Sequence, residues 1–144
     1  MRTSRTMGTI VMILGLLFVI AGGATYVMVS QELSNARVTV ADDASFLAGD
    51  EVDGPFSAYS QAQIIDKHAL ESTGGKTYAE LDREDPARQT AMSASFLRAS
   101  LFTSVVAFGV ATMAMGIGLA MILTGIGLRA RPEYAAEGAV RRDV

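Results

Sequence analysis

Residues 8–29 read GTIVMILGLLFVIAGGATYVMV, a run of 22 residues without a charged side chain. A helix rises 1.5 Å per residue, so about 20 apolar residues cross the roughly 30 Å hydrocarbon core of a bilayer. In lipid the backbone polar groups must bond to one another, and a single segment can achieve this only as a helix. The stretch therefore predicts a transmembrane helix over residues 8–29.

A second uncharged run of 30 residues lies between Arg98 and Arg129. Its first residues are partly polar, so we place the second transmembrane helix at residues 100–128. Pro132 then disfavours continuation of the helix. Two such blocks around a polar central segment, residues 30–99, predict a mainly α membrane protein. Its expected fold is a hairpin of two transmembrane helices with a small, mostly helical extracytoplasmic segment.

The arginines beside the apolar blocks indicate the orientation, because positive side chains favour the cytoplasmic side of a membrane. More of them belong to the chain ends than to the central segment. The set at the ends is Arg2, Arg5, Arg129, Arg131, Arg141 and Arg142, and the central set is Arg37, Arg88 and Arg98. We expect cytoplasmic tails over residues 1–7 and 129–144, and a multi-pass protein of the plasma membrane.

A cleaved signal peptide is the competing interpretation of the first block. Arg2 and Arg5 resemble its charged start, Ile10–Ala21 its apolar region, and Ala21-Gly22-Gly23 its cleavage site. The apolar run nevertheless continues to Val29, which is too long for such a region. We therefore favour an uncleaved membrane anchor.

Composition excludes several classes of function. The net charge is −3, and residues 30–99 carry twelve acidic against six basic side chains, with no basic stripe that would predict nucleic-acid binding. The chain has no cysteine, so disulfides and thiolate chemistry are absent. Neither predicted span contains Asp, Glu, Lys, Arg or His, which argues against an ion pathway or a proton relay.

Catalytic and ligand-binding motifs are also missing. His68 is the only histidine, whereas zinc and non-haem iron sites usually need two or three imidazoles or cysteines. Thr73–Thr77 ends in Gly-Lys-Thr, but Leu70 stands where a phosphate-binding loop needs its first glycine, so a helix-ending turn is favoured. The acidic residues of 42–53 lack the order of an EF-hand, although they leave a weak calcium site open. We expect no enzyme activity and no cofactor.

Small residues recur every seven positions in both predicted spans. This period keeps residues on one face of a helix in a left-handed pair, where small side chains allow close backbone approach. The candidate helix-packing residues are Gly8, Gly15 and Gly22 in the first span, and Ser104, Ala111, Gly118 and Gly125 in the second, beside a neighbouring pair formed by Gly109 and Gly116. They predict either a tightly packed hairpin or a contact surface for other membrane subunits.

Several short elements are expected in the central segment. Arg37–Ala41 alternates like a short strand. Pro55 is placed to begin a helix that runs to about Ser72 and ends at a glycine pair. Thr77 begins a capping-box pattern that predicts another short helix. Asp85-Pro86 predicts the start of a helix of roughly 40 residues that includes the second span.

The central segment has too few large apolar residues to be stable as an independent domain. We expect the surplus to be covered by the helix of residues 86–99 or, preferably, by a partner. The apolar candidates are Phe46, Leu47, Val52, Phe56, Tyr59, Ile64, Ile65, Leu70, Tyr78 and Leu81.

Two stretches, GPFSAYSQAQIIDKHALESTGGKTYAELDRED (54–85) and SASFLRASLFTSVVAFGV (93–110), resemble a group of small actinobacterial membrane proteins. The likeness implies a plasma-membrane location, but no defined activity. Members often bear the name aromatic ring-opening dioxygenase. Extradiol ring opening of that kind would need iron held by two histidines and a carboxylate, and this chain has a single histidine, so no catalytic residue is carried over.

Taken together, the sequence favours a non-catalytic accessory or scaffold protein of an envelope or respiratory membrane complex. The expected partners are the lipid bilayer and other membrane proteins or further copies of this chain, not nucleic acid. The alternative is a ligand- or ion-sensing module that acts through the acidic central segment.

Overall fold

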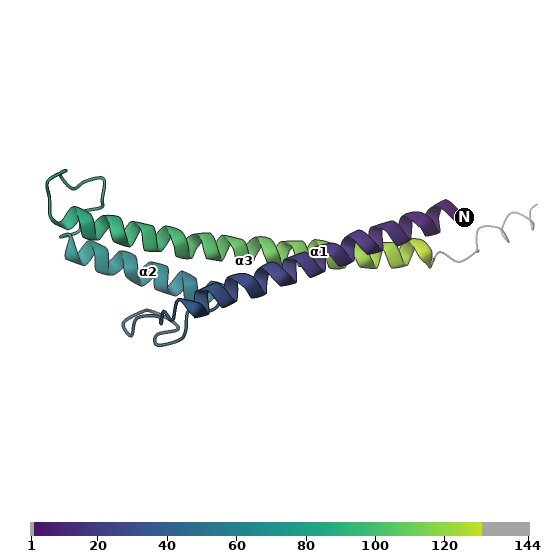
Figure 1. The fold of residues 1–144 in the computed structure, drawn as a ribbon, viewed down its shortest axis with the longest axis horizontal. Coiled ribbons are helices and arrows are strands. Elements are labelled where there is room, and N and C mark those ends of the chain that lie inside the picture. Colours follow the sequence, from purple (N-terminus) through teal and green to yellow (C-terminus); the bar gives the residue numbers. More distant parts are fainter. Residues whose placement is uncertain (1, 131–144) are drawn as a thin grey trace, which may run out of the picture. The chain divides into compact units, whose positions relative to one another are not determined.

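The computed structural model describes residues 2–130, and their side chains from residue 4 onward. This part of the chain is mainly helical, with α1 at Arg2–Asn35, α2 at Pro55–Ser72 and α3 at Ala87–Arg129 (Figure 1). It contains no named strand. The end of the predicted cytoplasmic tail, with Arg131, Pro132, Arg141 and Arg142, lies outside the described residues.

Helices α1 and α3 are long and apolar enough to cross a membrane. Only 11% of the most apolar window of α1 and 17% of that of α3 are buried within the protein. The core helix of a water-soluble domain would instead be mostly buried, because apolar area in water is costly, at about 25 cal/mol per Å². Most of the surface of these two windows is therefore not covered by the described residues.

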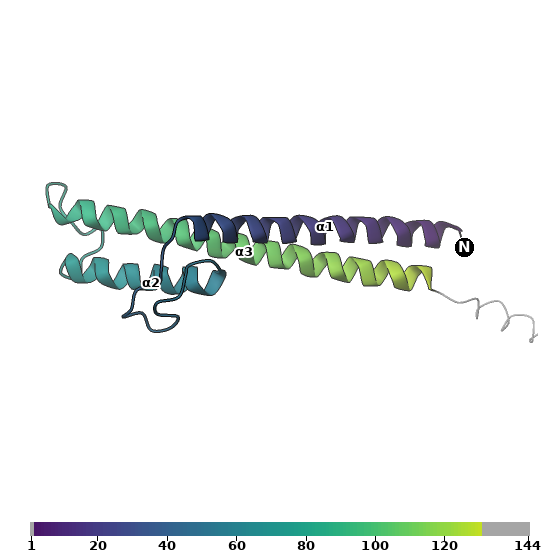
Figure 2. The same ribbon diagram turned by 60° about the horizontal axis from the view of Figure 1, so that its bottom comes forward.

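Residue contacts divide the chain into two compact units. The first combines Met1–Gly22 with Met113–Val144, and the second is Gly23–Thr112. In the first unit, the beginning of α1 lies alongside the end of α3, and the two run in opposite directions (Figures 1 and 2). In the second, α2 packs on the first half of α3.

Helix α2 has the predicted bounds. Its first turn begins at Pro55, and the Ser57 hydroxyl accepts hydrogen bonds from the backbone N–H groups of Asp53 and Gly54, at 3.2 Å each. The helix ends where Gly74 and Gly75 adopt positive φ angles of 64° and 82°. Glycine has no Cβ and adopts this conformation without strain, so the pair terminates the helix as expected.

Helix α3 confirms the expected continuous rod of roughly 40 residues, since it contains 43. The Asp85 carboxylate accepts a hydrogen bond of 2.9 Å from the Ala87 N–H group. It thereby satisfies a donor that the first turn of a helix leaves free, while Pro86 needs no such partner.

Two smaller expectations were wrong. The predicted strand Arg37–Ala41 is reduced to one antiparallel bridge between Thr39 and Glu51. The capping-box pattern at Thr77 forms its hydrogen bonds, because Glu80 accepts from the Thr77 N–H and hydroxyl groups at 2.8 Å each. Only a turn follows, however, not a helix. Because Pro86 disfavours helical geometry at Asp85, a helix that begins after Thr77 has only a few residues available before α3.

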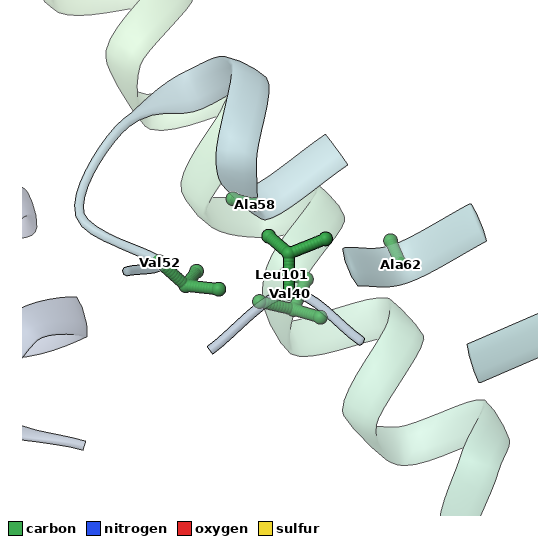
Figure 3. Close-up of a cluster of buried hydrophobic side chains, with 5 residues drawn as sticks. All are labelled: Val40, Val52, Ala58, Ala62 and Leu101. Atoms are coloured by element: carbon green, nitrogen blue, oxygen red, sulfur yellow. The ribbon is translucent and has the colours of Figure 1, made fainter. Parts of the chain in front are cut away.

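The second unit contains a compact core of small and medium apolar side chains, shown in Figure 3. Its buried members are Val40, Val52, Ala58, Ala62 and Leu101. The alanines of α2 allow a close approach to Leu101 of α3. Two hydrogen bonds hold the loop before α2 over this core. The Ala41 N–H group donates to the Gln61 side chain at 3.0 Å, and the Ser60 hydroxyl donates to the Phe46 carbonyl at 2.6 Å.

This core differs from the predicted set of large anchors. Val52, Ile64 and Leu81 are buried as expected, but Phe56 is 74% exposed. Phe46, Leu47, Tyr59 and Tyr78 also remain exposed. The physical reason is that helix packing at short distance favours small side chains in the contact, which pushes the large ones to its edge. Aromatic contacts at that edge join Tyr59 to Phe46 and Phe102.

Candidate helix-packing site

In the first unit α1 and α3 meet at four glycines, Gly8, Gly15, Gly118 and Gly125, which we call the glycine seam. The closest approach of the two backbones joins Gly15 and Gly118. A Cβ atom placed on Gly118 would lie 2.5 Å from the Gly15 carbonyl oxygen and 2.9 Å from the Val19 backbone nitrogen. A Cβ on Gly15 would lie 2.6 Å from the Gly118 carbonyl oxygen. Both backbones thus occupy space that any larger residue would need.

The second contact of the seam joins Gly8 and Gly125. A Cβ atom on Gly8 would lie 2.8 Å from the Gly125 carbonyl oxygen, and one on Gly125 would lie 2.6 Å from that of Gly8. Beside them the Ser4 hydroxyl donates a hydrogen bond of 3.1 Å to the Leu128 carbonyl. The first seven-residue repeat of α1 thus meets the last repeat of α3.

The other small residues predicted for packing have different surroundings. Gly22 and Ala111 are buried, and Ser104 is half-buried. Gly109 and Gly116 are exposed, and a Cβ atom on either would meet no other atom within 4 Å. The structure therefore brings Gly118 and Gly125 of α3 against α1 and leaves the neighbouring pair, Gly109 and Gly116, open.

Some residues of the contact were missed by the sequence reasoning. Met12 and Val19 lie four residues after the α1 glycines, and Met121 and Ile122 follow Gly118 on α3; all four contact the seam. Positions separated by four residues share a helix face with those separated by seven. An apolar residue four positions after each repeating glycine was the signal that could have identified Met12 and Val19.

The second unit carries an exposed polar cluster at the start of the loop and on α2. Asp43 accepts a hydrogen bond of 3.1 Å from Lys67 and lies 2.9 Å from the His68 Nε2 atom. These two partners hold the pKa of the Asp43 carboxyl below its usual value, His68 having the larger effect. Asp43 in turn raises the pKa of Lys67. The only histidine thus pairs with a carboxylate in a solvent-exposed contact.

Other charged groups fasten the second unit. Arg98 of α3 forms an ion pair of 2.7 Å with Asp66 of α2. Arg88 donates to the Tyr78 and Leu81 carbonyls, and its guanidinium lies 4.1 Å from the centre of the Tyr78 ring. The bonds that the Glu80 carboxylate accepts from Thr77 lower its pKa. Each of these groups connects the loop or α2 to α3 or stabilises a turn.

The Gly-Lys-Thr stretch belongs to the turn that ends α2, as predicted. Thr73, which opens the Gly-Lys-Thr stretch, donates its hydroxyl to the Lys76 carbonyl at 2.5 Å and so closes the turn after α2. Within residues 2–130 no group of three or more His, Asp or Glu side chains is placed to hold a metal ion.

Comparison with known proteins adds no family. No protein-family model matches the chain, and neither a curated protein nor a solved structure matches it at a significant level.

Proposed function

We propose that this chain is an integral membrane protein whose helices α1 and α3 cross the plasma membrane as a hairpin, with both termini in the cytoplasm. The observation that carries the proposal is the low burial of the two apolar windows, 11% and 17%. Lipid is the surrounding that makes such exposed apolar surface favourable. The close backbone contact at Gly15 and Gly118 supports the hairpin, since small residues are the usual means by which membrane helices associate.

Within the membrane, the proposed role is that of a non-catalytic accessory or scaffold subunit of an envelope or respiratory complex. Its support is the exposed apolar surface of the segment expected outside the membrane. Phe56 at the start of α2 is 74% exposed and Phe96 on α3 is 70% exposed, with Leu97 exposed beside it. Aromatic residues, phenylalanine included, are enriched in protein–protein interfaces, so these positions are suited to contact a partner.

Site-specific photocrosslinking tests this role. A photoreactive residue replaces Phe56 or Phe96 in the full-length protein in its native membrane, and Ser72, a polar exposed residue of α2, provides the control. The proposal predicts adducts with one defined membrane protein, or with a second copy of the chain, from Phe56 or Phe96 and none from Ser72. A chain that purifies in mild detergent as a bare monomer, with only lipid adducts at the aromatic positions, would contradict it.

A further inference from the structure

A cleft of about 380 Å³ opens at the Gly8–Gly125 end of the glycine seam. Arg5 and Met12 of α1 line it, together with Ile126, Arg129 and Ala130 at the end of α3. All five residues belong to the first unit. Its volume falls within the roughly 300–1,000 Å³ typical of small-molecule sites.

The cleft presents positive charge that no acid within residues 2–130 neutralises. Neither Arg5 nor Arg129 forms an ion pair with a described carboxylate, and both side chains are exposed. The Arg129 guanidinium donates to the sulfur atom of Met12, at 3.8 Å, which is a weak acceptor. Arginine in this state keeps its planar set of N–H donors available for an anion.

Two backbone carbonyl groups near the cleft already accept hydrogen bonds from other groups of the protein. The Leu128 carbonyl accepts from the Ser4 hydroxyl at 3.1 Å, and the Ile126 carbonyl accepts from the Ala130 N–H group at 2.9 Å. The lining therefore combines one guanidinium group from each helix, those of Arg5 and Arg129, with the apolar side chains of Met12 and Ile126.

We infer that this cleft binds the headgroup phosphate of an anionic phospholipid. Guanidinium groups form paired hydrogen bonds with phosphate oxygens, and basic pockets between membrane helices bind anionic headgroups. The apolar side chains of Met12 and Ile126 favour a lipid over a free anion, because they suit the glycerol and the first acyl carbons behind the phosphate. The inference rests on the proposed function, since a lipid reaches the cleft only if α1 and α3 lie in a bilayer.

The test uses the full-length protein in mild detergent and native mass spectrometry. Retention of phosphatidylglycerol is compared with that of phosphatidylcholine for the wild type, Arg5→Gln, Arg129→Gln and the double variant. Arg83→Gln, an exposed loop arginine, is the control. We expect preferential retention of phosphatidylglycerol, a fall of about fivefold for each cleft arginine replaced, and no change for the control.

Three outcomes decide the inference. Equal retention of the two lipids by the wild type, or unchanged phosphatidylglycerol retention by the double variant, would overturn it. Thermal stabilisation by inorganic phosphate as large as that by phosphatidylglycerol would also overturn it, because the site would then bind a free anion. Alkaline carbonate washing of membranes distinguishes failure of the lipid-binding inference from failure of the proposed membrane insertion. A protein that stays in the membrane but shows no lipid preference refutes lipid binding at the cleft alone. A protein released by the wash refutes membrane insertion.

Discussion

Replacement of Gly118 by alanine should separate α1 from α3 in the first unit. The added methyl carbon would lie 2.5 Å from the Gly15 carbonyl oxygen and 2.8 Å from the Val19 Cγ2 atom. Ordinary contacts of this kind begin at about 3.4 Å, so the helices must move apart by several tenths of an ångström or more. Overpacking of this kind typically costs about 1–3 kcal/mol. That loss corresponds to roughly a 5- to 150-fold decrease in the folding equilibrium constant.

The matched control is Gly116→Ala, two residues earlier on the same helix. A methyl group there would meet no other atom within 4 Å. Both substitutions remove one glycine from a helix interior and so share any gain in helix propensity, up to about 1 kcal/mol. The difference between the two variants therefore isolates the contact at the seam.

Two assays measure the effect. Reversible unfolding in mixed micelles gives the free energy of unfolding of each variant. The chain has no cysteine, so the pair Ser4→Cys and Leu128→Cys reports closeness of the helices by oxidative crosslinking without background. Gly118→Ala should lose stability and crosslink more slowly, whereas Gly116→Ala should match the wild type. Equal stability and equal crosslinking of the two variants would refute the reasoning.

Three further predictions concern the core, the loop and the amino terminus. Leu101→Ala should destabilise the second unit by about 2–5 kcal/mol in equilibrium unfolding, since Leu101 is buried, and the exposed Leu97→Ala should have little effect. The Asp43 carboxyl should titrate by NMR with a midpoint below its ordinary 3.8, because its contacts with His68 and Lys67 favour the charged form. Because its pKa is lowered, this contact stabilises the fold at pH values above the unfolded-state pKa, and the contribution disappears as the pH falls through the lowered pKa. The variant Asp43→Asn should abolish this pH dependence of stability. A titration midpoint at or above 3.8 would contradict the prediction. The first apolar block, residues 8–29, should remain in the mature protein when its peptides are mapped by mass spectrometry, whereas its loss would identify a signal peptide.

The helices were largely predictable because their determinants are local in sequence. Proline at residue 55 and the glycine pair after residue 72 define α2, and the Asp85-Pro86 pair defines the start of α3. Uninterrupted apolar runs then extend α1 and α3. Each of these signals acts through the backbone of its own segment, so no knowledge of the tertiary structure is needed.

The contacts between helices were harder to predict because they depend on both partners. Gly109 and Gly116 have the same size and spacing as Gly118 and Gly125, yet only the second pair faces α1. The choice depends on the side chains that fill the space beside the glycines, such as Val19 and Met121, and these act only once the helices meet.

The core of the second unit was predicted least well. Reasoning from residue size favoured large anchors such as Phe56, but the structure buries Val40 and the α2 alanines. These small residues are buried because α2 approaches α3 closely, and a count of large apolar residues does not predict that approach.

Cysteine accessibility in intact membranes tests the central claim most directly. Ile20 is 58% exposed and Leu123 is 68% exposed in the structure, so a water-soluble maleimide would react with a cysteine at either position if water surrounded the helices. Membrane insertion predicts that Ile20→Cys and Leu123→Cys stay unmodified until the bilayer is dissolved, while Ser72→Cys reacts from the outside. Rapid modification of Ile20→Cys and Leu123→Cys in sealed membranes would contradict the account.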